Sequence, residues 1–172
     1  MLANQTRIWL GSRFGFGFYR ASRLSVAFVF EPQRAGLNDC LPLALGRGQL
    51  LEAACVLAGD RGWLFCTLAT PTGRHCQVTA FTIRGDLLAQ QTFDPAQTPW
   101  LTQIHGKCAV GNDLFAATDE GIVRIARRDR QLVVAQTFPA TEPFVNAATP
   151  LLAGTDGIYA IAAQQIQRLQ IA

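Results

Sequence analysis

The chain has 172 residues, which is long enough for one domain with its own hydrophobic core. Hydrophobic residues make up 49% of it and charged residues 16%, a balance that excludes an intrinsically disordered chain. The formal net charge of +3 is too small to point by itself to a polyanionic partner, although residues 1–50 carry six arginines against two acidic residues.

Apolar segments and cysteines predict the cellular compartment of the protein. The apolar stretch Ile8–Leu10 is too short for the core of a signal peptide. The longest strongly apolar run, Leu24–Phe30, is far shorter than the roughly 20 residues that span a bilayer. Five cysteines are spread along the chain, and Cys55, Cys66 and Cys76 lie in apolar runs, where free cysteine behaves as a small hydrophobic residue. We therefore expect a soluble, reduced, cytoplasmic protein without membrane contact.

Strands are predicted along nearly the whole chain, from alternation, β-branched and aromatic content, and turn residues. In chain order they cover residues 7–12, 15–21, 24–30, 50–58, 62–69, 76–84, 87–93, 106–111, 113–118, 121–127, 131–138, 144–148, 150–154, 157–162 and 165–171. Turn signals separate them, for example Gly111-Asn112-Asp113 and Asp156-Gly157. The one passable helical pattern, Leu50–Leu57, leads into an Ala-Gly-Asp turn and is predicted as a strand too.

A short phrase recurs with substitutions. Each copy consists of a predicted strand that ends in a small hydroxyl residue, a tight turn that contains glycine, and a second predicted strand. Its copies are Ile8-Trp9-Leu10-Gly11-Ser12 before Arg13-Phe14-Gly15, Leu114-Phe115-Ala116-Ala117-Thr118 before Asp119-Glu120-Gly121, and Leu151-Leu152-Ala153-Gly154-Thr155 before Asp156-Gly157. A second echo, Gln91-Thr92-Phe93 and Gln136-Thr137-Phe138, is spaced by 45 residues. Steps of about 40 to 45 residues with four strands each are typical of β-propeller blades.

The phrases Ile-Trp-Leu-Gly-Ser…Gly-Phe-Gly-Phe-Tyr-Arg and Ala-Thr-Asp-Glu-Gly-Ile-Val-Arg-Ile resemble second-to-third-strand hairpins of β-propeller repeats. They are most similar to the sensor-type, NHL-like repeats of that superfamily. The resemblance covers most of residues 7–30 and 113–171 and only weakly 50–93. The Trp-Asp and Gly-His marks of WD repeats are absent, as are the Gly/Trp-rich signatures of quinone-binding propellers.

The period and the resemblance together predict an all-β, β-propeller-like array of about four four-stranded antiparallel blades. It forms a single domain over residues 1–172, with blades at about 7–30, 50–93, 105–138 and 144–171 and a long inserted loop at 31–49. Alternate residues such as Leu132/Val134 and Val133/Ala135 are both apolar, so neighbouring blades are expected to bury both faces of each sheet.

The sequence does not decide whether the blades close into a ring. Residues 1–6 are short and polar, so the first unit is predicted to lack its leading strand. This leaves a small four-bladed ring, a partial or half propeller that is the C-terminal part of a longer one, or two copies that join into one ring. Starting in mid-blade favours the fragment, whose open edge would attract partner strands.

Candidate binding residues lie in the loops between second and third strands and between units, which are expected on one face of such an array. They are Arg13, Phe14, Arg34, Asp39, Arg47, Arg74, His75, Trp100, Asp119, Glu120 and Asp156. The connection 31–49 is either locally structured or a binding loop. Trp100 is either an aromatic anchor or a cap on the core.

Metal and catalytic sites are not predicted. His75 and Cys76 are adjacent, so on a strand they point to opposite faces, and His105 and Cys108 have no partner Cys-x-x-Cys pair. The chain contains no Gly-x-Ser-x-Gly nucleophile elbow. Gly15-x-Gly17 precedes no helix, so we expect it to let neighbouring strands approach closely rather than to hold phosphate.

Nucleic-acid binding is also disfavoured. Arginines and aromatic residues interleave between Arg7 and Arg23, as in single-strand binding surfaces, but these aromatics belong to the phrase expected to pack blades. We therefore predict a non-catalytic binding platform without cofactor, for another protein or another region of its parent chain, with a homo-oligomer completing a ring as one partner. The alternative is a sensor or small-ligand-binding propeller. A hydrolase- or lyase-type enzyme is less supported.

Overall fold

All regular structure in the computed structural model is β-structure. The model describes residues 5–10, 15–20, 25–30, 41–43, 49–94, 96–98, 101, 106–139, 149–162 and 165–169. These residues form 15 strands, so the all-β prediction is confirmed. In this part of the chain no helix has the length and apolar character needed to cross a membrane.

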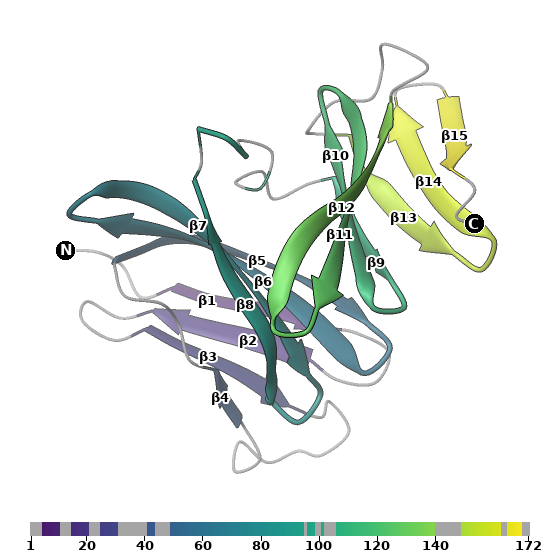
Figure 1. Cartoon of the computed structure of the whole chain (residues 1–172). Coiled ribbons are helices and arrows are strands. Elements are labelled where there is room, and N and C mark those ends of the chain that lie inside the picture. Colours follow the sequence, from purple (N-terminus) through teal and green to yellow (C-terminus); the bar gives the residue numbers. More distant parts are fainter. Residues whose placement is uncertain are drawn as a thin grey trace. The chain divides into compact units, whose positions relative to one another are not determined.

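The strands form four antiparallel sheets, each a meander of consecutive strands (Figure 1). The first sheet contains β1 (Gln5–Leu10), β2 (Gly15–Arg20), β3 (Ser25–Phe30) and β4 (Leu41–Leu43). The second contains β5 (Gln49–Ala58), β6 (Arg61–Thr70), β7 (Gly73–Thr82) and β8 (Leu87–Phe93). The third contains β9 (Lys107–Val110), β10 (Asp113–Thr118), β11 (Gly121–Arg128) and β12 (Gln131–Pro139). The last contains β13 (Leu151–Gly154), β14 (Gly157–Ala162) and β15 (Gln165–Leu169).

Most predicted strands are confirmed, because glycine and asparagine mark the turns between them. The predictions for 87–93, 113–118 and 157–162 coincide with β8, β10 and β14. The predicted leading strand of the last unit, 144–148, lies outside the described residues, and the last sheet has three strands in the part that is described.

The first sheet differs from its prediction, because it has four strands rather than three. The additional strand, β4, lies within the segment predicted as a long loop. It pairs with β3 through Leu41 opposite Val29 and Leu43 opposite Ala27. Proline is tolerated on an edge strand, where its missing N–H faces away from the ladder, and this explains why Pro42 does not prevent pairing. The predicted count of three strands in this unit is therefore wrong, although no strand precedes β1 among the described residues.

The chain divides into two compact units, Met1–Asp94 and Pro95–Ala172. The first unit holds the first two sheets, and β1 and β2 contact β5. The second unit holds the last two sheets, and β9 and β10 contact β13. The assignment of one domain with four blades stays a prediction.

The second sheet is buried on both faces. Leu64 and Cys66 point to one face of β6, while Trp63 and Phe65 point to the other, and none of the four is more than 4% exposed. Position 62 requires glycine, because the ring of the cross-strand partner Phe81 occupies the space where a Cβ would lie. The apolar–apolar alternation of this strand therefore reflects cover on both sides, as predicted.

The third sheet is likewise buried on both faces along its central strands. Phe115 and Ala117 of β10 belong to a core shared with the last sheet, and Leu114 and Ala116 are buried on the opposite face. That shared core also includes Cys108, Ile122, Leu151, Ile158 and Ala160, with Val110, Phe138 and Leu169 packed against it. Within the third sheet, the predicted burial fails toward β12, an edge strand on which Val134 and Ala135 are exposed.

Candidate functional site

Five of the eleven predicted site residues fall within the described residues: Arg74, His75, Asp119, Glu120 and Asp156. The other six, Arg13, Phe14, Arg34, Asp39, Arg47 and Trp100, lie outside them. Each of the five lies in a four-residue turn between two strands or within two residues after it. We call these turns, Thr70–Gly73, Thr118–Gly121 and Gly154–Gly157, the turn tips.

The first turn tip joins β6 to β7. The Thr70 hydroxyl donates a hydrogen bond to the carbonyl oxygen of Gly73 at 3.0 Å, and it also lies 3.0 Å from the hydroxyl of Thr72. Thr72 in turn contacts Nε2 of His75 at 3.2 Å. Gly73 has φ = +125°, a backbone conformation that L side chains rarely adopt. The turn is therefore held by its own threonine and glycine, with Arg74 exposed beside it.

The second turn tip joins β10 to β11 and repeats this construction. The buried Thr118 hydroxyl donates to the carbonyl oxygen of Gly121 at 3.0 Å and accepts the backbone N–H of Glu120 at 3.1 Å. Gly121 has φ = +134°. Asp119 and Glu120 form the exposed tip. The same Thr-x-x-Gly frame therefore presents Pro71-Thr72 on the second sheet and Asp119-Glu120 on the third.

The third turn tip joins β13 to β14 and carries a charged cluster. Tyr159 donates its hydroxyl to Oδ1 of Asp156 at 2.7 Å, and the Arg168 guanidinium binds Oδ2 at 2.8 Å. The hydrogen bond from Tyr159 is the main reason that the pKa of Asp156 is lowered, with Arg168 adding to the effect. The same bond raises the pKa of Tyr159. Sequence reasoning found Asp156 but not its partners, because Arg168 comes close only through its register opposite Tyr159.

A second charged pair was missed for the same reason. Nε of Arg124 donates to Oδ2 of Asp113 at 2.7 Å, and both side chains are partly buried. Arg124 lies opposite Phe115, so Asp113 is its diagonal neighbour across β10 and β11. The pair lies on the same face of the sheet as Phe115.

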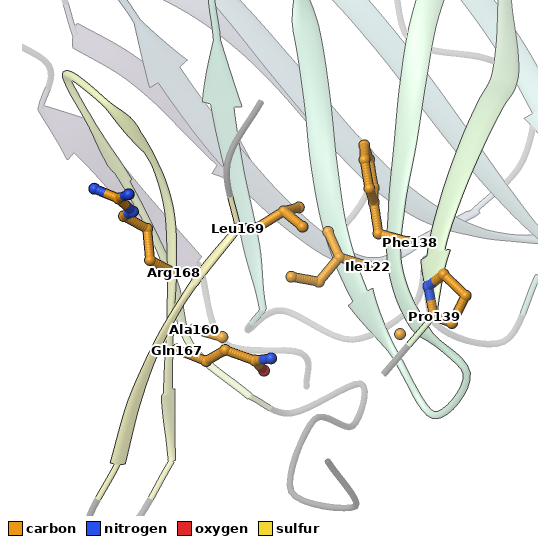
Figure 2. Close-up of a pocket in the computed structure, with 8 residues that line it drawn as sticks. Ile122, Phe138, Pro139, Ala160, Gln167, Arg168 and Leu169 are labelled. Atoms are coloured by element: carbon orange, nitrogen blue, oxygen red, sulfur yellow. The ribbon is translucent and has the colours of Figure 1, made fainter. Parts of the chain in front are cut away.

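A small pocket lies between the third and last sheets (Figure 2). Its volume is about 30 Å³, and its lining is Gly121, Ile122, Phe138, Pro139, Ala160, Gln167, Arg168 and Leu169. Figure 2 shows Leu169 pointing toward Ile122 and Phe138. A water molecule needs at least about 10–15 Å³ of such space, so this pocket has room for one or two waters.

The described cysteines are free thiols on the strands; Cys66, Cys76 and Cys108 are buried, as expected for small hydrophobic residues, and Cys55 is half-buried. Burial raises the pKa of Cys66 to about 12 and that of Cys108 to about 12. Burial also raises the pKa of Cys55 well above its usual value. Because the thiolate is the reactive form, these thiols are poor nucleophiles at neutral pH. In the described part of the chain, no three His, Cys, Asp or Glu side chains meet in a group that could hold a metal ion.

The chain matches no family model, no curated protein and no solved structure.

Proposed function

We propose that the chain is a non-catalytic binding platform, a β-propeller-like array whose turn tips present side chains to another protein or to another region of its parent chain. The observation that carries the proposal is the Thr-x-x-Gly frame, which recurs with the same hydrogen bond on the second and third sheets. A constant frame with different tip residues is how repeat folds build binding surfaces.

The frame matters because it orders the backbone before any partner arrives. Thr70 and Thr118 close their own turns by hydrogen bonds, and Gly73 and Gly121 supply the positive φ that the turn requires. A preorganised loop loses less conformational entropy on binding than a mobile one. The exposed acidic pair Asp119-Glu120 on such a frame favours a partner that presents basic side chains.

The array itself is supported by how the sheets are packed. The second and third sheets are successive antiparallel meanders, and both are buried on two faces. A sheet with two apolar faces needs a neighbour on each side, and stacked repeat units supply those neighbours.

A protein partner is favoured over a small ligand by the size of the pocket. Small-molecule sites usually enclose about 300–1,000 Å³, whereas the pocket at Leu169 has about 30 Å³. Catalysis is disfavoured because the described site residues lie in separate turns, and because the buried thiols are held protonated. A sensor or small-ligand-binding propeller is the second candidate.

The test is affinity capture from a lysate of the source organism, with the purified partner then titrated by calorimetry. Asp119→Asn with Glu120→Gln removes two negative charges at the second turn tip and should weaken binding at least tenfold. Asn112→Lys with Gln131→Lys makes the same change of net charge at exposed positions on the opposite end of the sheet, and should leave affinity unchanged.

Equal affinity of both variants and the wild type would exclude this turn tip from binding. The thermal unfolding midpoint is measured for each variant, because loss of capture together with a lower midpoint would return Asp119 and Glu120 to a structural role. Saturable binding of a small metabolite, with no captured protein, would favour the sensor instead.

A further inference from the structure

A hairpin tip at one end of the third sheet carries three exposed arginines, Arg127, Arg128 and Arg130. Within the described part of the chain, none of their side chains has a hydrogen-bond or ion-pair partner. Asp129 lies between them and sets one negative charge against their three positive charges. We call residues 127–130 the arginine tip.

The backbone of the arginine tip is held by the ladder between β11 and β12. Arg128 pairs with Gln131, so the loop that joins the two strands has only two residues. The first of them, Asp129, has φ = +55°, a left-handed conformation that aspartate tolerates better than most residues. The arginines are therefore presented from a backbone that the ladder fixes, which lowers the conformational entropy lost on binding.

The arginine tip is separate from the turn tips described above. Asp119 and Glu120 directly precede β11, whereas Arg128 is its last residue. At about 3.3 Å per residue, the length of β11 puts roughly 25 Å between its two ends. The third sheet therefore carries an acidic turn at one end and a basic turn at the other, and each can contact a partner independently.

The strand that follows the arginine tip is an edge strand. Among the described residues β12 pairs with β11 alone. Alternate residues of an edge strand point their N–H and C=O groups away from the sheet, where another strand can pair with them. Gln131–Val134, the part of β12 next to the arginine tip, contains no charged residue. Gln131 is exposed, and Val134 is 48% exposed.

The features that protect an edge strand lie on the other half of β12. Ala135 is the extra residue of a β-bulge, because the register with β11 shifts between Val134 and Gln136. Pro139 is the last residue of the strand. Bulges, prolines and charged residues are the means by which natural proteins prevent a further strand from pairing with an edge. None of them occurs in Gln131–Val134, where the edge is uninterrupted.

We propose that an extended acidic segment of another protein pairs with Gln131–Val134 as a further strand, and that the arginine tip binds its carboxylates. The backbone groups of an edge strand match those of a peptide. A guanidinium group binds a carboxylate through two parallel hydrogen bonds. The three arginines without partners therefore determine the charge of the added strand. The site goes beyond the proposed function and does not involve Asp119 or Glu120, so either site can fail without the other.

A nucleic acid matches this site less well. Its phosphates would pair with the arginines, but the arginine tip and Gln131–Val134 contain no aromatic side chain on which a base could stack. The backbone groups at the edge of β12 would also stay unpaired. An acidic peptide uses both features at once.

Peptide display gives the first test. A library of random twelve-residue peptides is selected on the purified full chain, and the enriched sequences are read. We expect enriched peptides that carry two or more Asp or Glu residues at one end and β-branched or aromatic residues beside them. A selected pool without acidic peptides contradicts the proposal, whatever basic peptides the second turn tip selects.

Fluorescence anisotropy with the most enriched acidic peptide tests the arginines. Arg128→Gln with Arg130→Gln removes two positive charges and should raise the dissociation constant at least about tenfold. Arg74→Gln with Arg84→Gln makes the same change of net charge at exposed arginines of the first unit and should leave it within about twofold. Unchanged affinity of the first variant, together with increased aggregation, would show that these arginines only protect the edge strand, and would contradict the proposal.

Amide hydrogen exchange shows whether a strand is added. Alternate amides within Gln131–Val134 should exchange rapidly in the free chain and at least about tenfold more slowly when the peptide is saturating. Unchanged exchange would exclude strand addition. Protection in the free chain that is lost on dilution would show that a second copy covers β12. Displacement of the peptide by a twelve-nucleotide oligothymidine that binds more tightly would assign the arginine tip to nucleic acid; each of these three results overturns the proposal.

Discussion

The second sheet and the last sheet are built from the same kind of hairpin but differ in what covers them. Trp63 and Leu64 point to opposite faces of β6, and both are buried. Leu151 and Leu152 alternate in the same way on β13, yet only Leu151 is buried. The strand pattern is therefore similar in the two regions, and the difference lies in the number of neighbouring sheets. Two apolar faces on one strand predict two neighbours, and the last sheet has one among the described residues.

The largest expected contrast comes from truncating one side chain in each environment. Phe115→Ala removes a ring that is 1% exposed in the core and should cost about 3–5 kcal/mol of unfolding free energy. Ile166→Ala, at a side chain of the last sheet that is 69% exposed, should change it by less than about 0.5 kcal/mol. Urea denaturation followed by circular dichroism measures both. Similar losses at the two sites would show that Ile166 is covered.

A smaller loss is expected where the second sheet is packed most tightly. Gly62→Ala places a methyl group in the space of the Phe81 ring and should destabilise the fold by about 1–3 kcal/mol. Combining Gly62→Ala with Phe81→Leu should restore part of that loss, because the smaller side chain leaves room for the methyl group. A double-mutant cycle from urea denaturation gives the coupling. Additive effects would show that the ring does not constrain Gly62.

Alkaline pH should weaken the doubly buried sheets through their thiols. Cys66 and Cys108 have folded pKa values of about 12, above the value of about 9 in an unfolded chain. The unfolded state therefore loses these protons first, and stability present below pH 9 is lost progressively between about pH 9 and 12. Each thiol should contribute a loss of about 1 kcal/mol by pH 10.

Urea titrations at pH 8, 9 and 10 measure this loss. Cys66→Ala should lower stability at every pH but flatten the slope above pH 9. An unchanged slope in this variant would mean that other groups, such as Tyr159 with its raised pKa, carry the alkaline dependence.

The smallest expected changes in stability distinguish the Asp113–Arg124 pair from the Asp156–Arg168 pair. Asp113→Asn weakens a charge-assisted hydrogen bond to Arg124 in a partly buried setting and should cost about 0.5–1 kcal/mol. Asp156→Asn acts on an exposed pair with Arg168 and should cause no measurable change in the unfolding midpoint. Differential scanning calorimetry at low and high salt compares them. A larger loss for Asp156→Asn would assign a structural role to the third turn tip.

The sequence was sufficient for most strands because glycine, asparagine and aspartate mark their turns. It placed β10 and β14 correctly from the residues that flank Gly121 and Gly157. It missed β4, since three residues that include Pro42 show no periodicity and are defined only by pairing with β3. It also placed the start of β7 late, because the ladder continues to Gly73 through the polar residues Arg74 and His75.

The site was less predictable because its contacts depend on register. The hydroxyl residue before each glycine was visible in the repeated phrase, and Thr118 indeed holds the turn that carries Asp119 and Glu120. The pairing of Asp113 with Arg124 was not, because it depends on the register between β10 and β11, which sets Arg124 opposite Phe115 and so diagonal to Asp113. Alternation alone likewise gave no sign of which face of β13–β15 lacks a neighbour.

Hydroxyl-radical footprinting tests the contrast between the two sheets most directly. Trp63 and Leu64 should remain unmodified, because they are 2% and 0% exposed. Leu152, Ile161 and Ile166 should be modified, because they are 56%, 36% and 69% exposed. Protection of these three residues to the level of Trp63 and Leu64 would show that this face of the last sheet is covered, and would contradict the account.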